Sequence, residues 1–66
     1  MGRRLSAMIA RLRKQRNLTL LQLANKVGVT EAYMSMLESG VRVNPSLATL
    51  KKLAKVLKVT VAELVD

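Results

Sequence analysis

The sequence predicts a single all-α domain of five short helices. The chain has 66 residues, more than the roughly 40 that a domain needs to fold without staples and far fewer than two domains need. Half of its residues are hydrophobic, yet one tyrosine is the only aromatic residue. The core must therefore be built from aliphatic side chains and methionine. Apolar residues recur at helical spacing in several segments, and this periodicity favours packed helices over strands.

An amphipathic first helix is expected from Arg3 to Arg16. Its apolar face follows the i, i+3, i+4, i+7 spacing of a helix, with Leu5, Met8, Ile9 and Leu12. Arginine and lysine occupy much of the remaining surface of this segment. Asn17 can end the helix because asparagine tolerates a left-handed backbone better than most residues.

A second helix is predicted from about Leu20 to Val27. Thr19 and Gln22 have the spacing of a capping box, in which each side chain reaches a free N–H group at the start of the helix. Gly28 ends this helix because glycine adopts a positive φ without steric cost. Leu20 and Leu21 are adjacent on one helix, so one of the two should be exposed.

A third helix follows after a tight turn, from Glu31 to about Ser39. Thr30 is placed to cap its first turn, and Gly40 is placed to end it. Its spacing puts Met34 in the core and Met36 on the surface.

Two further helices complete the prediction. Residues 41–45 contain the only proline and no helical period, so they form the longest loop. Ser46 caps a fourth helix, whose apolar stripe comprises Leu47, Leu50, Leu53, Ala54 and Leu57. Thr60 and Glu63 form another capping box, and they start a short last helix over Val61–Val65 with Leu64 in the core.

The composition argues against catalysis. The chain has no cysteine and no histidine, which excludes disulfides, the usual zinc sites and histidine-based catalytic triads. Its carboxylates are Glu31, Glu38, Glu63 and Asp66, and no glycine-rich phosphate loop accompanies them. We therefore expect no enzymatic activity, no metal, no cofactor and no small-molecule substrate.

The charge points to a polyanionic partner. Twelve lysines and arginines against four acidic residues give a net charge of +8, which favours nucleic acid or an anionic membrane surface. No run approaches the ~20 apolar residues that span a bilayer. A membrane-active amphipathic peptide would account for the first helix but not for four further capped helices. We therefore expect a cytoplasmic protein that does not bind membranes.

The predicted helix pair from Thr19 to Gly40 resembles the helix-turn-helix of the Cro/CI-type, lambda-repressor-like family (also called XRE) of bacterial and phage regulators. The residues that carry the resemblance are Leu12-Arg13, Leu18-Thr19, Leu23-Ala24, Val27 to Thr30, Met34-Ser35, Leu37 to Gly40, Arg42, Asn44 to Leu47, Leu53-Ala54, Leu57 and Val59. They extend over essentially the whole chain, 1–66, in the expected order and at the expected intervals.

The resemblance implies a sequence-specific regulator of transcription that binds double-stranded DNA, with a repressor as the first expectation. Its third helix would lie in the major groove, and the start of its second helix would meet a phosphate. The residues that the resemblance places at DNA are Thr19, Leu20, Thr30, Glu31, Ala32, Tyr33, Ser35, Met36, Ser39 and Arg42. It also implies that Arg13 and Glu38 form a salt bridge between the first and third helices, which would aim the arginine at the DNA backbone.

This sequence departs from the family pattern in its charges and at one contact position. Leu20 stands where the family commonly has glutamine, so that side-chain contact with DNA is lost. Residues 17–50 are neutral, because Lys26 and Arg42 balance Glu31 and Glu38. The excess cations lie in residues 1–16 and 51–66. An alternative therefore stays open, in which an antitoxin or adaptor uses the same fold mainly to bind another protein.

The family also implies a homodimer, because one such helix reads too few base pairs for specificity in a genome. Our hypothesis places the contact on the last helix, where Val61 and Val65 leave apolar surface. DNA binding would associate the protein with the nucleoid.

Overall fold

The computed structural model describes residues 2–41 and 44–65, and these residues form five α-helices and no strand. The helices are α1 (Gly2–Gln15), α2 (Leu20–Val27), α3 (Glu31–Ser39), α4 (Leu47–Leu57) and α5 (Val61–Val65). The all-α prediction is confirmed, and α2, α3 and α5 have the predicted bounds. The first helix begins and ends one residue earlier than predicted, a shift that is typical of helix ends because they fray.

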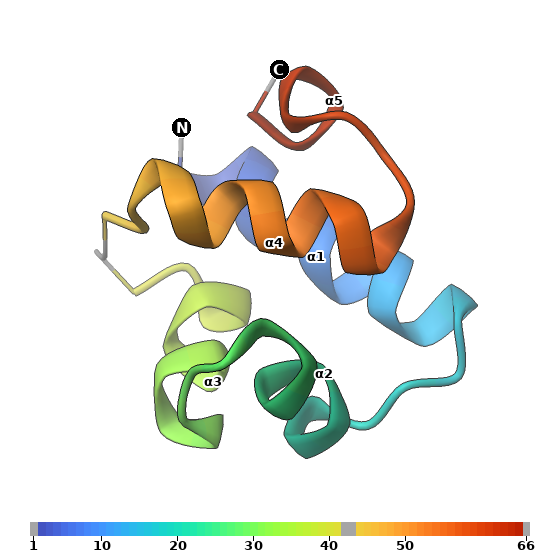
Figure 1. Cartoon of the computed structure of the whole chain (residues 1–66). Coiled ribbons are helices and arrows are strands. Elements are labelled where there is room, and N and C mark those ends of the chain that lie inside the picture. Colours follow the sequence, from blue (N-terminus) through green and yellow to red (C-terminus); the bar gives the residue numbers. More distant parts are fainter. Residues whose placement is uncertain (1, 42–43, 66) are drawn as a thin grey trace.

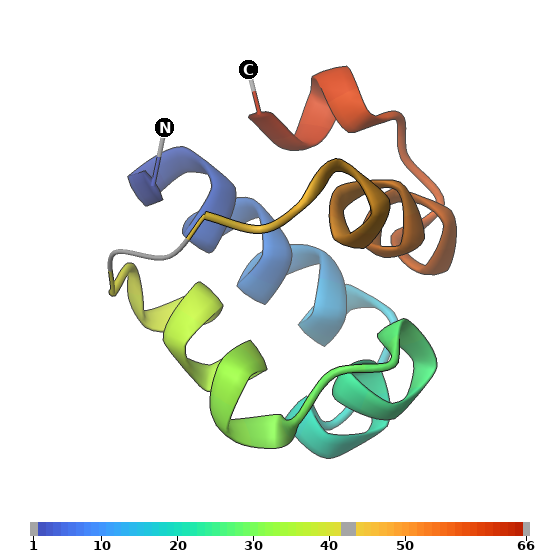
Figure 2. The same ribbon diagram turned by 60° about the vertical axis from the view of Figure 1, so that its left-hand side comes forward.

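Helix α1 is the central element of the fold. It packs against α3, α4 and α5, while α2 packs against α3 and α4. Figure 2 shows α1 between α3 on one side and α4 with α5 on the other. Helices α2 and α3 lie together at one end of the molecule, and α5 lies at the opposite end (Figure 1).

The core is built from aliphatic side chains and one methionine, as predicted, and every helix contributes to it. Its buried apolar residues are Leu5, Ile9, Leu12, Leu23, Ala24, Val27, Met34, Leu37, Leu50, Leu53, Ala54, Leu57 and Leu64. Met36 is exposed, as its spacing indicated, and Leu21 is the exposed member of the adjacent leucine pair.

The prediction that Leu47 belongs to the buried stripe of the fourth helix is wrong, because this residue is 60% exposed. It is the first residue of α4. Side chains on a helix tilt toward the N-terminus, so this side chain points past the end of the core rather than into it. The buried stripe of α4 therefore begins one turn later, at Leu50.

Local hydrogen bonds fix where four of the helices begin. The hydroxyl of Thr19 accepts from the Gln22 N–H at 3.0 Å, and the Gln22 side chain accepts from the Thr19 N–H at 2.8 Å. Thr60 and Glu63 form the same reciprocal pair. Thr30 and Ser46 each accept from the N–H three residues later. All four predicted caps are confirmed.

Residues with a left-handed backbone follow the ends of the first four helices. Gly28 and Gly40 have φ values of 86° and 80°, and Asn17 has a φ of 56°, as the sequence indicated. Lys58 also takes a positive φ, of 58°, and ends α4 without a glycine. No helix in the described part of the chain has the length and apolar character needed to cross a membrane.

Candidate nucleic-acid interface

Helices α2 and α3 form a helix-turn-helix. Ala24 anchors the turn, because its carbonyl accepts from the N–H groups of Gly28 at 2.8 Å and Val29 at 3.0 Å. The inner face of α2 is buried through Leu23, Ala24 and Val27, and the inner face of α3 is buried through Met34 and Leu37. The outer face of α3 is left to the solvent.

Five of the six α3 residues that the sequence placed at DNA are exposed. They are Glu31, Ala32, Ser35, Met36 and Ser39. Tyr33 is half-buried and packs against the core, so packing occupies part of its ring. Among these six side chains only Glu31 carries a charge. The surface can therefore recognise a partner through one carboxylate, small side chains and a flexible thioether, with no cation on it.

The hydroxyl groups at the helix ends differ in what they can still donate. Thr19 and Thr30 use their oxygen to accept a backbone N–H, which leaves each O–H free to donate to an anion. Ser39 instead donates its O–H to the Met36 carbonyl at 3.1 Å. Ser39 would have to turn away from its own helix before it could bind a phosphate.

The start of α2 offers backbone donors as well. Thr19 and Leu20 form this end of the helix, and Leu20 is half-buried against the core. The first N–H groups of a helix have no partner within it, and the helix dipole favours negative charge there. The N–H groups of Leu20 and Leu21 are therefore suited to an anion, while the N–H of Thr19 is already bonded to Gln22.

A salt bridge joins α1 to α3. The Nε of Arg13 donates to Oε2 of Glu38 at 2.6 Å, and its Nη2 donates to Oε1 at 3.1 Å. The two side chains are only 15% and 12% exposed. The expected pairing of Arg13 with Glu38 is thus present. Its geometry turns the guanidinium toward the protein, so the bridge fixes the position of α3 and leaves little of Arg13 for a phosphate.

Sequence reasoning missed one partner of this bridge. The Nη1 of Arg13 donates to the backbone carbonyl of Leu18 at 2.8 Å, which ties the loop before α2 to the same guanidinium. No side-chain pattern marks a carbonyl as an acceptor, so the sequence held no signal for this contact. Arg42, the remaining predicted phosphate contact, lies outside the described residues.

The charges around the helix-turn-helix are carried by the neighbouring helices. Exposed cations lie on α1, in the turn just after it, and on the stretch from α4 to Lys58: Arg4, Arg11, Lys14, Arg16, Lys51, Lys52, Lys55 and Lys58. Helix α2 adds one exposed cation, Lys26, and α3 adds none. Electrostatic attraction to a polyanion would therefore come mainly from the cations on and next to α1 and α4, which flank the helix-turn-helix.

Comparisons with known proteins agree with this architecture. A protein-family model described as "Helix-turn-helix" matches residues 9–64. The chain is 40% identical over 58 residues to the HTH-type transcriptional regulator SinR of Bacillus subtilis, covering 88% of this chain and 52% of SinR. It is 50% identical over 48 residues to the HTH-type transcriptional repressor RghR of the same organism, covering 73% of this chain and 36% of RghR.

A solved structure matches over nearly the whole length. The crystal structure of SinR, described as the master regulator for biofilm formation in complex with DNA, superposes with a TM-score of 0.87 at 37% identity. The superposition covers 94% of this chain and 98% of that one. The chain spans about half the length of the curated SinR. With the family match over most of its residues, the chain belongs to the helix-turn-helix family of the Cro/CI type.

Proposed function

We propose that the chain is the DNA-binding module of a transcriptional regulator that reads double-stranded DNA with α3. The observation that carries the proposal is the exposed outer face of α3, which the Arg13–Glu38 bridge holds in a fixed position on α1. The likeness to a SinR structure solved with DNA supports it. The likeness to the repressor RghR favours repression by occupancy of a promoter.

The chemistry of α3 limits what it can read. A carboxylate at Glu31 accepts a hydrogen bond from the N4 amino group of cytosine and repels the acceptor edge of guanine. Ala32 and Met36 are apolar and exposed, and such side chains contact the methyl group of thymine. We therefore propose that α3 recognises cytosine and thymine in the major groove.

Phosphate contacts would come from two sources. The first is the start of α2, where the Thr19 hydroxyl and the N–H groups of Leu20 and Leu21 are available. The second is a set of exposed cations on the flanking helices, Arg4, Arg11, Lys14 and Lys51, whose long side chains can reach a backbone without fixed geometry. In this arrangement, α3 determines which bases are preferred, and the cations on the flanking helices supply most of the salt-dependent affinity for DNA. A protein with this activity would be found with the nucleoid in the cytoplasm.

Selection and sequencing of random duplex DNA bound by the purified chain near physiological salt tests the proposal. We expect an inverted repeat with half-sites about one helical turn, roughly 34 Å, apart, because two copies of α3 would read it symmetrically. Absence of any enriched sequence, with binding that disappears steeply as salt rises, would mean that only phosphate attraction remains.

The same selection with the variant Glu31→Gln directly tests the proposed contact between Glu31 and cytosine. A glutamine side chain both donates and accepts, and it pairs well with adenine. We expect the preferred base to change at one position of each half-site while the others stay the same. Lys51→Gln is the matched control, because it removes an exposed charge outside α3 and should leave the base preferences unchanged.

A protein-binding module of the antitoxin or adaptor type is the second candidate. The observation that favours it is the lack of any cation on α3, together with the exposed Met36. If the selection enriches no sequence, this candidate replaces the first.

A further inference from the structure

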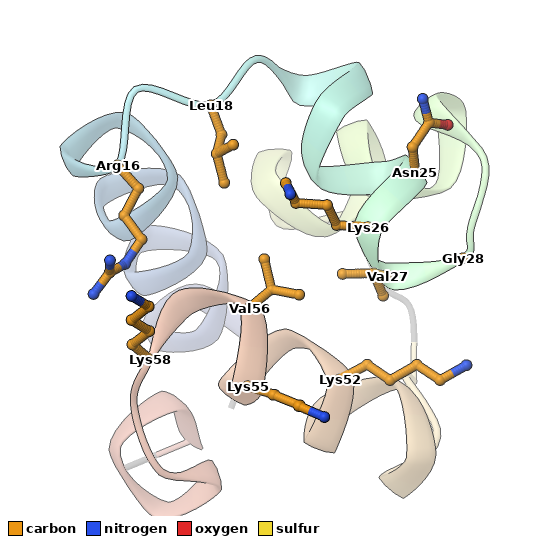
Figure 3. A pocket seen from close by; sticks show the side chains of 10 residues that line it. All are labelled: Arg16, Leu18, Asn25, Lys26, Val27, Gly28, Lys52, Lys55, Val56 and Lys58. Carbon is orange, nitrogen blue, oxygen red and sulfur yellow. The ribbon is translucent and has the colours of Figure 1, made fainter.

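A second surface of the molecule carries a cluster of cations that the proposed DNA contacts do not use. A groove with a volume of about 760 Å³ lies where the ends of α1, α2 and α4 meet. Its cationic lining residues are Arg16, Lys26, Lys52, Lys55 and Lys58, and none of its lining residues is acidic. Figure 3 shows that they come from separate segments around one space.

The floor of this groove is apolar. Leu18, Val27 and Val56 line it, and Figure 3 shows Leu18 and Val56 pointing toward each other across it. Val27 is buried, while Leu18 and Val56 are half-buried and keep part of their surface open. The groove thus combines an aliphatic floor with a rim of positive charge.

Helix ends explain only part of this charge. Arg16 donates from its Nε to the Leu57 carbonyl at 3.1 Å and so caps the end of α4. Lys26 and Lys55 lie in the last turns of α2 and α4, where cations offset the helix dipole. Lys52 lies in the middle of α4 and has no such role. Arg13–Glu38 is the only ion pair among the described residues, so no carboxylate neutralises the rim.

We propose that this groove binds an acidic segment of a partner protein, one in which carboxylates alternate with aliphatic side chains. The carboxylates would pair with the lysines of the rim, and the aliphatic side chains would cover Leu18 and Val56. Charge complementarity selects an acidic partner and steers its approach. The apolar floor favours a peptide over a purely charged ligand. Aliphatic side chains of a peptide can be buried against the floor, and this burial adds affinity that charge alone does not supply.

Two other anionic ligands, free phosphate and a DNA duplex, fit the groove less well. A small free phosphate needs donors that converge on one point, whereas these cations stand around a groove of about 760 Å³ with an apolar floor. A DNA duplex would contact the rim through phosphates and leave the aliphatic floor unfilled. None of the residues placed at DNA lines the groove, so α3 and the groove can be occupied at the same time.

A peptide titration tests the inference. The probe is a short synthetic peptide in which pairs of glutamates alternate with single leucines, added to the isotope-labelled chain near physiological salt. We expect the backbone amide resonances of Lys26, Gly28, Lys52 and Val56 to shift, while those of Glu31 and Ser35 on α3 stay in place. A peptide of equal charge without leucine should bind at least about fivefold more weakly.

Charge reversal on α4 provides the matched variants. Lys52→Glu combined with Lys55→Glu should weaken peptide binding by about tenfold or more, whereas Lys51→Glu should change it by less than about twofold. All three lysines are exposed, and only Lys51 lies outside the groove. Thermal unfolding curves of the variants check that the fold is kept.

Three outcomes would overturn the inference. The first is a titration without shifts, or with shifts on α3 instead of the groove. The second is an equal loss of peptide binding in Lys51→Glu and in the double variant. The third is a double variant that loses affinity for duplex DNA but not for the peptide, which would make the groove a nucleic-acid surface.

Discussion

Arg13 joins three parts of the fold through one side chain. Its guanidinium contacts both oxygens of Glu38 and the Leu18 carbonyl, so one side chain joins α1, α3 and the loop before α2. A charged pair that is mostly buried stabilises a fold only while both partners are present, because either charge alone is costly to bury.

Arg13→Ala should therefore lower the free energy of unfolding by about 2 kcal/mol, since it leaves Glu38 mostly buried without its partner. Urea unfolding followed by circular dichroism measures the loss. Arg11→Ala is the control, because Arg11 is exposed on the same helix and should cost little. An equal cost for both variants would show that the bridge adds nothing to stability.

At the scale of the elements, each short helix depends on the residues at its ends. Helix α2 has eight residues, too few to be stable by itself. It is fixed by the Thr19–Gln22 capping box at its start, by Gly28 at its end and by three buried residues between them. The turn after Gly28 then sets the direction in which α3 leaves.

Gly28→Ala should cost about 1 kcal/mol, because the φ of 86° disfavours any side chain. Steric conflict adds little, since the atom nearest to a methyl group at this position would be the flexible Lys52 Nζ, at 3.9 Å. Thermal unfolding measures the effect. Gly28→Asn should cost less, because asparagine tolerates this conformation. A larger loss for asparagine than for alanine would contradict a purely conformational cost.

The elements also show where sequence reasoning succeeds and where it stops. The caps at Thr19, Thr30, Ser46 and Thr60 were predictable because their bonds join residues three apart in the chain. The exposure of Leu47 was not, because it depends on where α4 begins relative to the core. The basic groove was missed for the same reason: its lysines and arginine gather from segments up to 42 residues apart, Arg16 to Lys58.

Among the candidate site residues, periodicity predicted that Met36 faces the solvent, and the family resemblance indicated the other exposed residues of α3. Neither could predict that Ser39 donates to its own helix or that Arg13 turns inward. Both depend on the orientation of a side chain among its neighbours, which spacing along the chain does not determine.

At the scale of the whole molecule, the proposed mechanism needs two copies of α3, so we propose a homodimer. The contact that we propose is α5, which packs on α1 and α4 at the end of the molecule opposite α2 and α3. Val61 and Val65 are half-buried against the core, so each offers the second copy only part of its surface. Because two partly buried valines supply little free apolar surface, we expect a weak dimer that is stabilised when both copies bind DNA.

Val65→Asp should therefore shift the chain toward monomer in sedimentation experiments at tens of micromolar (~10–50 μM), because it would bury a charge in the contact. Ala62→Asp, on the exposed side of the same helix, is the control. A monomer in the unchanged chain, with no effect of Val65→Asp, would remove α5 as the contact.

The most direct test of the central claim is a resonance map of the chain bound to its selected duplex. Reading by α3 predicts that the largest amide shifts fall on Leu20, Leu21 and the outer face of α3, from Glu31 to Ser39. Smaller, salt-sensitive shifts should appear on the flanking cations. Shifts confined to α1 and α4, with α3 unchanged, would contradict the claim and leave the chain as a basic surface that attracts DNA without reading it.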